Sequence, residues 1–497
     1  MIPAISLEVT VLLLGIFLLL TESFSKSDDK RGLAITAITI LLALVGFSFF
    51  ASPDIGNLAP FYAADATALF FKRIALVTTA VVLVMALEYK SVLAKFIPGE
   101  TPGAGLGEFY TLPVFTCAGL MFMASAVDFI FIFVSLELVT VSFYVLVAYM
   151  RRQSASLEAG VKYLILGALS TGFLVYGITW IFGVTGQTNL AAIGAVLKAG
   201  EVAQAPLLFG IILVLIALGF KVAAVPFQLW VPDVYQGAPT PITAFLSVGS
   251  KAAGFIVLLR VLEPFLAVPV VGGKVLAVLA ILAGATLVYG NLAALPQDNF
   301  KRLLAYSSIG HAGYLLIAVS SVRDTAGSLG SAGVAVGYYL AGYLLMTLLS
   351  FLIMIVVANH SRGDDILHFN GLAKRSPFLA FGLLTAMLSL AGVPFTAGFI
   401  GKFLVFAAAV QAGQYILIGL GIITVAAGFY YYLRVVAAMY WAEPGDETPI
   451  LIAPLTKSVI GILTVLIFVF GVFPQPILRM LEDPAASLRP VLHSTAR

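Results

Sequence analysis

The sequence has little charge and almost no cysteine. Only 10% of its 497 residues are charged and 61% are hydrophobic, whereas soluble chains are about 25% charged. Its single cysteine, Cys117, permits neither a disulfide nor a cysteine-held iron-sulfur cluster. The net charge of +3 is too small to indicate a nucleic-acid partner. No metal-ligand cluster, activated nucleophile or phosphate-binding loop occurs. We therefore expect no cofactor and no metal on this chain.

Long apolar runs fill the chain instead and leave no stretch long enough for a soluble domain. A membrane-spanning helix needs about 20 apolar residues, and about fourteen such runs can be counted, which predicts an all-α polytopic membrane protein. The predicted spans are 3–21, 33–51, 68–88, 108–126, 128–149, 158–183, 206–229, 239–262, 275–295, 301–320, 331–358, 377–410, 414–441 and 455–474.

The basic residues are distributed unevenly between the two ends of these spans. If the connections alternate sides, 15 lysines and arginines fall on one side and 9 on the other. The positive-inside rule then places both termini on the non-cytoplasmic side. The first run has no basic segment before it and no small-residue cleavage site, so we expect a retained span rather than a signal peptide.

A short motif is repeated in the two halves of the chain. Ala224-Val225-Pro226-Phe227 recurs as Gly392-Val393-Pro394-Phe395, 168 residues later. Each copy lies in a proline-interrupted apolar run with a lysine nearby, a pattern typical of paired broken helices in transporters. We predict helices 1–3 in residues 1–106, inverted five-helix repeats in 107–266 and 275–441, and helix 14 with a tail in 442–497. Helices 7 and 12 should be broken.

Four ionisable residues lie deep within apolar runs. When 24 of the 27 basic residues are assigned to positions near helix ends, Lys221, Lys251 and Lys402 remain. Glu137 is the one acid that lies equally deep. Each such charge costs roughly 2.5–3.5 kcal/mol in a membrane, and intramembrane charges usually mark ion pathways. Alternatively, Glu137 and Lys221 form a buried ion pair that only fixes helix packing.

Lysine suits a proton pathway because burial and a movable carboxylate can switch it between holding and releasing a proton. Lys221 lies five residues before Pro226 and Lys402 eight residues after Pro394. Both should therefore lie beside a helix break, where unpaired backbone groups and water collect. Lys251, one predicted helix beyond Lys221, is placed to receive the proton in the middle of the membrane.

His311 is the only histidine inside a predicted span. Its imidazole could relay protons between Lys251 and Lys402, or it could be a packed histidine bonded to a backbone carbonyl. Lys162 either extends to the cytoplasmic surface or donates protons inward toward Glu137. Asp233, beside Pro232, is more naturally a helix cap than the end of a proton entrance.

Four stretches resemble a known family. They are GVKYLILGALSTGFLVYGITWIFGVTG, FKVAAVPFQLWVPDVYQGAPTPITAFLSVGSK, KRLLAYSSIGHAGYLL and GVPFTAGFIGKF. They are similar to subunit N of the proton-pumping NADH:quinone oxidoreductases (respiratory complex I), one of the antiporter-like subunits, and the resemblance extends over essentially the whole chain. It implies a fold of fourteen helices with two inverted five-helix repeats and broken seventh and twelfth helices.

The resemblance also implies roles for individual residues. Glu137 would tune Lys221, Lys251 would be the central relay, and Lys402 would lie near the outlet. Lys162 and His311 match positions that the family treats as part of its polar axis.

One position departs from the family pattern. Gln228 stands where relatives commonly carry histidine. We expect Gln228, together with water, to act as the relay there.

By the same resemblance, this chain would be one subunit of a proton translocase in the bacterial inner membrane. FMN, iron-sulfur clusters and the quinone site would belong to partner subunits, and the neighbours would be a K-type and an M-type subunit. Two alternatives stay open. The chain could be a subunit of an Mrp-type cation/proton antiporter, or a scaffold whose charges have no transport role.

Overall fold

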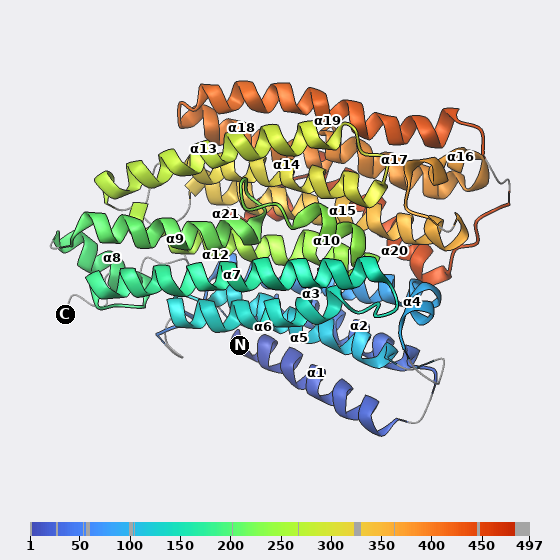
Figure 1. Cartoon of the computed structure of the whole chain (residues 1–497), viewed down its shortest axis with the longest axis horizontal. Coiled ribbons are helices and arrows are strands. Elements are labelled where there is room, and N and C mark those ends of the chain that lie inside the picture. Colours follow the sequence, from blue (N-terminus) through green and yellow to red (C-terminus); the bar gives the residue numbers. More distant parts are fainter. Residues whose placement is uncertain are drawn as a thin grey trace.

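A computed structural model gives the structure of the chain. It describes residues 2–482 except 26–27, 53, 56–59, 99–102, 104, 201, 267, 323–329, 362 and 445–447. The predicted tail beyond residue 482 and both termini lie outside the described residues. The fold is all-helical, as predicted, and the long helices lie side by side with their axes roughly aligned (Figure 1).

The first part of the chain forms a run of long helices with short connections. These are α1 (Ile5–Phe24), α2 (Arg31–Phe47), α3 (Ala66–Glu88), α4 (Lys90–Phe96), α5 (Leu106–Ser125), α6 (Phe129–Val147), α7 (Ser154–Thr185) and α8 (Leu190–Ala199). Four two-residue strands complete this part: β1 (Ile2–Pro3) pairs in parallel with β2 (Ala51–Ser52), and β3 (Asp54–Ile55) pairs antiparallel with β4 (Ala63–Ala64).

The remainder is also helical. It contains α9 (Gln204–Val222), α10 (Val231–Gly237), α11 (Thr240–Phe245), the π-helical turn η1 (Leu246–Ser250), α12 (Lys251–Leu266), α13 (Pro269–Ala294), α14 (Phe300–Ser320), α15 (Gly330–Ser361), the 3-10 turn η2 (Ile366–Phe369), α16 (Leu372–Arg375), α17 (Pro377–Ala391), α18 (Ala397–Gln411), α19 (Tyr415–Trp441), α20 (Pro454–Val472) and α21 (Gln475–Glu482).

Among the described residues, twelve helices are long and apolar enough to cross a membrane. The chain is therefore a multi-pass membrane protein. A total of fourteen would also require the shorter α2 and the pair α17 and α18 to span, so that number stays a prediction. The division into two five-helix repeats likewise stays a prediction.

Both predicted helix breaks are present. Helix α9 ends at Val222 and α10 begins at Val231, while α17 ends at Ala391 and α18 begins at Ala397. The residue after α9, Ala223, has φ +65°, and the residue after α17, Gly392, has φ +91°. A left-handed residue turns the chain out of a helix, and a following proline cannot continue it.

The centre of the bundle is formed by helices that are buried on every side. The continuous segment from α11 to α12 and helix α14 are buried along their whole spanning windows, whereas α1, α7, α19 and α20 are largely exposed at the periphery. A helix that is hydrophobic all round is expected in such a core. Because α12 and α14 carry Lys251 and His311, these polar groups lie in the middle of the bundle.

Candidate functional site

Lys221 lies in the last turn of α9, at the edge of the first break. Its side chain is 6% exposed, and Nζ donates to Thr140 Oγ1 on α6 at 2.5 Å. The indole of Trp230, beyond the break, donates to Phe220 O at 3.1 Å. The Phe220 carbonyl, which also accepts from Ala223 N at 3.2 Å, is thus bonded from the far end of the break.

Glu137 lies on α6 but forms no direct ion pair with Lys221 in the described structure. It is half-buried and accepts a hydrogen bond from Thr171 Oγ1 on α7 at 2.8 Å. Thr140, which receives Lys221, is three residues further along α6, so both groups lie on one face of that helix. The carboxylate can therefore influence Lys221 electrostatically without neutralising it by contact, and the alternative of a simple packing ion pair loses support.

Lys251 begins α12 immediately after the π-helical turn η1. Only 2% of it is exposed, and Nζ donates to Ser308 O on α14 at 2.5 Å and also to Ser308 Oγ. Lys221 packs close by: a methyl group added at Gly254, one turn beyond Lys251, would lie 3.5 Å from Lys221 Cβ. The first two lysines are thus held on adjacent, tightly packed helices.

His311 on α14 lies within a group of tyrosines. Its Nδ1 is 2.6 Å from Tyr339 Oη, and its Nε2 is 3.1 Å from Tyr432 Oη. Two further rings link it to the lysines. The centroid of the Tyr343 ring lies 5.1 Å from that of the imidazole and 5.4 Å from Lys251 Nζ. The centroid of the Tyr314 ring lies 6.4 Å from that of the imidazole and 5.1 Å from Lys402 Nζ.

This arrangement places His311 between Lys251 and Lys402, as the relay interpretation requires. The alternative hypothesis, a packed histidine bonded to a backbone carbonyl, does not fit these contacts, because both ring nitrogens face tyrosine hydroxyls. A hydroxyl can donate or accept, so either tautomer of the imidazole is accommodated.

Lys402 lies on α18, after the second break. Its Nζ donates to Leu390 O at 2.9 Å and to Ala391 O at 2.8 Å. These are the last carbonyls of α17, which a cation stabilises through both hydrogen bonding and the helix dipole. The side chain is 7% exposed and connects α18 to the end of α17.

Asp233 forms the hub of an ionic group at one end of the bundle. It contacts Lys162 Nζ at 2.6 Å and Arg302 Nη1 at 2.8 Å, and Lys162 also contacts Glu158 at 2.7 Å. The prediction that Asp233 caps a helix is wrong, since both carboxylate oxygens are engaged by these cations and α10 has no side-chain cap. Lys162 is 41% exposed and reaches this surface group rather than Glu137.

Gln228 lies in the segment between α9 and α10. It is 3% exposed, and its Oε1 has no hydrogen-bond partner in the part of the chain that the structure describes. None of the hydrogen bonds described here joins it to Lys221 or Lys251. Its proposed relay role stays a prediction.

The expectation that only four charges are deeply buried is wrong. Glu8 and Lys72 are both 0% exposed and form an ion pair at 2.6 Å, and Arg260 and Asp65 form a second buried pair at 2.8 Å. Lys301, also assigned to a helix end, is 2% exposed. Neighbouring helices cover these positions, which a count along a single span does not reveal.

Sequence reasoning also missed most of the partners of the lysines and of His311. These partners are Thr140, Tyr314, Tyr339, Tyr343 and Tyr432, all buried. The four-residue spacing of Tyr339 and Tyr343, which puts both on one face of α15, is the signal that could have revealed them.

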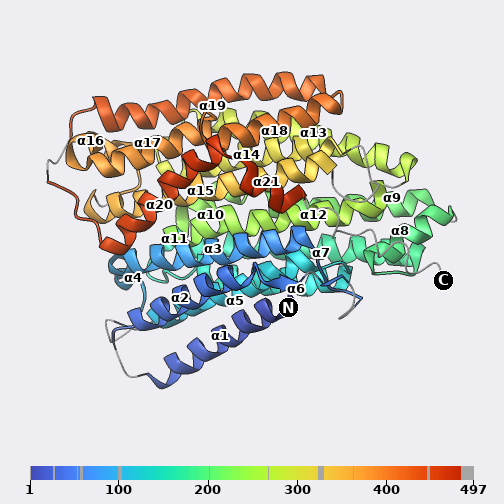
Figure 2. The same cartoon turned by 180° about the vertical axis from the view of Figure 1, so that it is seen from behind.

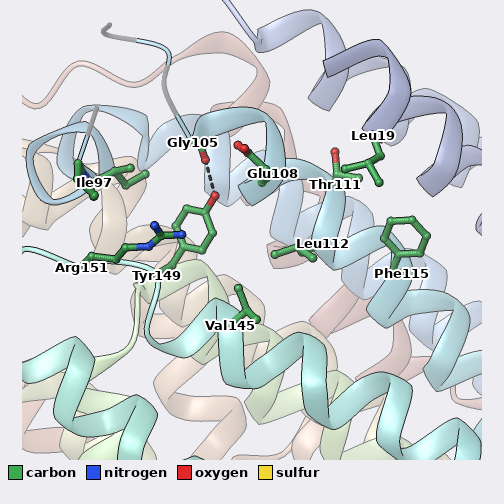
Figure 3. Close-up of a pocket in the computed structure, with 11 residues that line it drawn as sticks. Leu19, Ile97, Gly105, Glu108, Thr111, Leu112, Phe115, Val145, Tyr149 and Arg151 are labelled. Carbon is green, nitrogen blue, oxygen red and sulfur yellow. Dashed lines mark hydrogen bonds between the residues drawn. The ribbon is translucent and has the colours of Figure 1, made fainter. Parts of the chain in front are cut away.

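A separate cavity of about 370 Å³ lies between α1, α5 and α6. Figure 3 shows the polar side chains Arg151, Tyr149 and Glu108 around one part of it and Leu112 and Phe115 around another. Tyr149 Oη donates to Gly105 O at 2.7 Å. None of the lysines described above lines this cavity, so it is not part of the line from Lys221 to Lys402.

Comparison with known proteins identifies the family. Residues 126–428 match the family described as the transmembrane region of NADH:quinone oxidoreductase and Mrp antiporters. The chain is 41% identical to NADH-quinone oxidoreductase subunit N of Trichlorobacter lovleyi over 446 residues, which cover 88% of this chain and 87% of that protein. This chain belongs to the NADH-quinone oxidoreductase subunit N family.

Solved structures agree with membership of the subunit N family. A chain of respiratory complex I from Thermus thermophilus superposes with a TM-score of 0.78 at 30% identity, covering 95% of this chain and 98% of that one. A chain of the Mrp complex from a Dietzia species has a TM-score of 0.80 at 18% identity, covering 98% and 99%. At that identity the Mrp match shows only a shared fold.

Proposed function

We propose that this chain is a proton-translocating subunit of the membrane arm of an NADH:quinone oxidoreductase. Its family supports a place in such a complex. The transport role is supported by one observation above all: Lys221, Lys251 and Lys402 are buried, yet the hydrogen-bond acceptors described for each are neutral oxygens. With no carboxylate in contact to hold the charged form, each ammonium group can release its proton.

The proposed order of the transfers follows the contacts described above. A proton enters from the end at Asp233 and Lys162 and reaches Lys221, whose affinity for it is tuned by Glu137. It passes to Lys251 and then, through the Ser308 and Tyr343 hydroxyls, to His311. A neutral imidazole accepts on one nitrogen and donates from the other. From His311 the proton passes, through the tyrosine hydroxyls around it, to Lys402. It leaves Lys402 toward the outlet.

The energy for transport would come from partner subunits. FMN, the iron-sulfur clusters and the quinone belong there in this proposal, with a K-type and an M-type subunit as neighbours. The membrane is the bacterial inner membrane, and both termini face the non-cytoplasmic side. An Mrp-type antiporter is the less favoured function, because the 41% identical relative from Trichlorobacter lovleyi is a subunit N protein.

The test replaces Lys251 by methionine in the complete complex, reconstituted in vesicles. Lys274→Met is the matched control, since Lys274 is an exposed lysine on the neighbouring helix α13. Loss of a positioned proton carrier should lower proton pumping by roughly tenfold or more and slow coupled quinone reduction. Pumping by Lys251→Met equal to that of Lys274→Met would reject the proposal and favour a scaffold.

Purification of the same complex tests the alternative. Flavin-containing and iron-sulfur subunits should copurify with this chain. A stable complex of membrane subunits alone, active in cation/proton exchange, would instead support an antiporter.

A further inference from the structure

The cavity between α1, α5 and α6 lies on a membrane-facing side of the protein. Figure 2 shows α1 at the outer edge of the bundle. Two residues that line the cavity, Leu19 on α1 and Val145 on α6, are 43% and 46% exposed. Exposed apolar side chains at the edge of a multi-pass protein contact lipid. The occupant of this cavity should therefore come from the membrane.

The packing of α1 on α5 determines where the cavity lies. A methyl group added at Gly15 would lie 2.9 Å from Phe115, and one added at Gly107 would clash with the Glu22 carboxyl group. The two helices thus approach closely at two glycines. Leu19 lies between Gly15 and Glu22 on α1 and lines the cavity. Its volume of about 370 Å³ falls within the range of about 300–1,000 Å³ that is typical of small-molecule sites.

Two charged side chains line one end of the cavity. Glu108 is in the first turn of α5, and Arg151 follows the end of α6 at Val147. Figure 3 shows Arg151 and Glu108 on opposite sides of Tyr149. Within the described part of the chain, neither charged side chain has a hydrogen-bond or ion-pair partner. Charged groups at helix ends lie at the depth of the lipid headgroups, so both are available to a headgroup.

The polar end of the cavity offers one cation and three groups that accept hydrogen bonds. Tyr149 Oη and Thr111 Oγ1 each donate their hydrogen to a backbone carbonyl, at 2.7 and 2.9 Å. Toward a ligand both oxygens can therefore only accept, as can the Glu108 carboxylate. The Arg151 guanidinium can only donate. This set is complementary to a phosphate that lies next to a group with N–H donors.

The other end of the cavity is apolar. It is lined by Leu112 and Phe115 on α5, together with the exposed Leu19 and Val145. Glu108 and Phe115 are seven residues apart, which corresponds to about 10 Å along the helix. The cavity thus extends from the depth of the headgroups into the hydrocarbon region, which is the way a phospholipid is oriented in a membrane.

We propose that this cavity binds a glycerophospholipid whose headgroup carries a primary ammonium group, of the phosphatidylethanolamine class. Arg151 binds the phosphate through charge-assisted hydrogen bonds. Glu108 and the two hydroxyl oxygens bind the ammonium group. The first part of an acyl chain lies against Leu112 and Phe115. This inference does not depend on the proposed proton transport.

The same contacts disfavour other headgroups. A choline headgroup has no N–H bond to donate to the three acceptors. Phosphatidylglycerol has a phosphate for Arg151 but no cation, so the Glu108 carboxylate repels it. The cavity should therefore select the ethanolamine headgroup from both.

The experiment measures capture of lipid by the complete purified complex. Phosphatidylethanolamine with a diazirine in its acyl chain is added and irradiated, and the labelled peptides are identified by mass spectrometry. We expect labels on α1, α5 and α6 around the cavity. The corresponding phosphatidylcholine and phosphatidylglycerol probes should be captured there roughly tenfold less, because they lose charge-assisted hydrogen bonds. Equal capture of the three probes would overturn the inference.

Arg151→Gln and Glu108→Gln test the two charged contacts. The matched control is Arg152→Gln, because Arg152 is the adjacent exposed arginine and does not line the cavity. Arg151→Gln should lower capture of the ethanolamine probe roughly tenfold, and Arg152→Gln should not change it. Glu108→Gln should lower the preference for this probe over phosphatidylglycerol. Capture by Arg151→Gln equal to that by Arg152→Gln, or an unchanged preference in Glu108→Gln, would overturn the inference.

Two further measurements keep the test decisive. If Arg151→Gln does not assemble, Val145→Trp takes its place, because this side chain is half-exposed and a larger ring there fills the apolar end. Val145→Trp should lower labelling of the cavity several-fold, and unchanged labelling would overturn the inference. Excess inorganic phosphate should not displace the lipid probe. Displacement by phosphate would show a site for a free anion and would also overturn it.

Discussion

The two broken helices share the letters Val-Pro-Phe but hold their lysines in different ways. At the first break, Lys221 precedes the interruption and donates to the Thr140 hydroxyl on another helix. At the second, Lys402 follows the interruption and donates to two backbone carbonyls of the half-helix before it. A similar motif thus gives one lysine a side-chain partner that substitution can remove and gives the other a partner fixed by the backbone.

The difference also extends to the backbone of the two breaks. Ala223 adopts a left-handed conformation at the first break, whereas Gly392 does so at the second, where Phe395 is a further left-handed residue. The second half is therefore not a geometric copy of the first, and the two lysines should respond differently to substitution.

Replacement of each lysine by methionine is expected to give the largest effects. Lys221→Met and Lys402→Met should each lower proton pumping by roughly tenfold or more, because each removes a proton carrier. Only Lys402→Met should also destabilise the subunit, by about 1–3 kcal/mol, since it leaves buried carbonyls unpaired. Thr140 keeps its own bond to Leu136 O, at 2.7 Å, when Lys221 is lost.

Pumping assays together with thermal unfolding of the purified complex check this pair. Equal unfolding temperatures for the two variants would remove the distinction between the two breaks. Normal pumping by either variant would exclude that lysine from the pathway.

A pair of substitutions at the left-handed residues should have intermediate effects. Gly392→Ala adds a methyl group at φ +91°, 2.9 Å from Lys402 Cδ, so we expect a loss of about 1–3 kcal/mol and a displaced Lys402. Ala223→Gly should change stability by less than about 1 kcal/mol, because relief of backbone strain opposes the added freedom of the unfolded chain. Thermal unfolding and pumping of both variants provide the measurement. A larger loss from Ala223→Gly would contradict this account.

Thr140 allows the first break to be tested without altering its lysine. Thr140→Val keeps the shape of the side chain but removes the oxygen that accepts from Lys221, whereas Thr140→Ser retains that oxygen. We expect the valine variant to pump several-fold more slowly, because the charged lysine loses its hydrogen-bond partner and is disfavoured. The serine variant should pump almost normally. Equal rates for the two variants would show that the hydroxyl has no part in transport.

The sequence allowed the burial of Lys221, Lys251 and Lys402 to be predicted, but not that of the ion pair formed by Glu8 and Lys72. Lys221, Lys251 and Lys402 stand far from both ends of the apolar runs in which they lie, where no snorkelling is possible, so their burial follows from their position in the sequence alone. Glu8 and Lys72 lie within two turns of helix ends, where a charged side chain often reaches water. Only the packing of α1 against its neighbours decides that they are buried.

The partners of His311 were unpredictable for a related reason. Tyrosine is common at membrane interfaces, so Tyr432 carried no distinct signal in a chain with 19 tyrosines, and the spacing of Tyr339 and Tyr343 indicates only a shared helix face. They come from α15 and α19 and meet His311 only through the tertiary arrangement. The helix breaks were predictable because proline and left-handed residues act locally.

The smallest effect is expected at Gln228, between the two halves of the first break. We expect Gln228→Leu to slow pumping by only a few-fold, because water alone could still join Lys221 to Lys251 when the side-chain amide is absent. Stability should stay the same or rise slightly, since an unpaired buried oxygen is removed. Gln228→Asn, which keeps an amide, is the control for loss of the polar group. Unaltered pumping by Gln228→Leu would place the step from Lys221 to Lys251 elsewhere, for example directly across the close contact at Gly254.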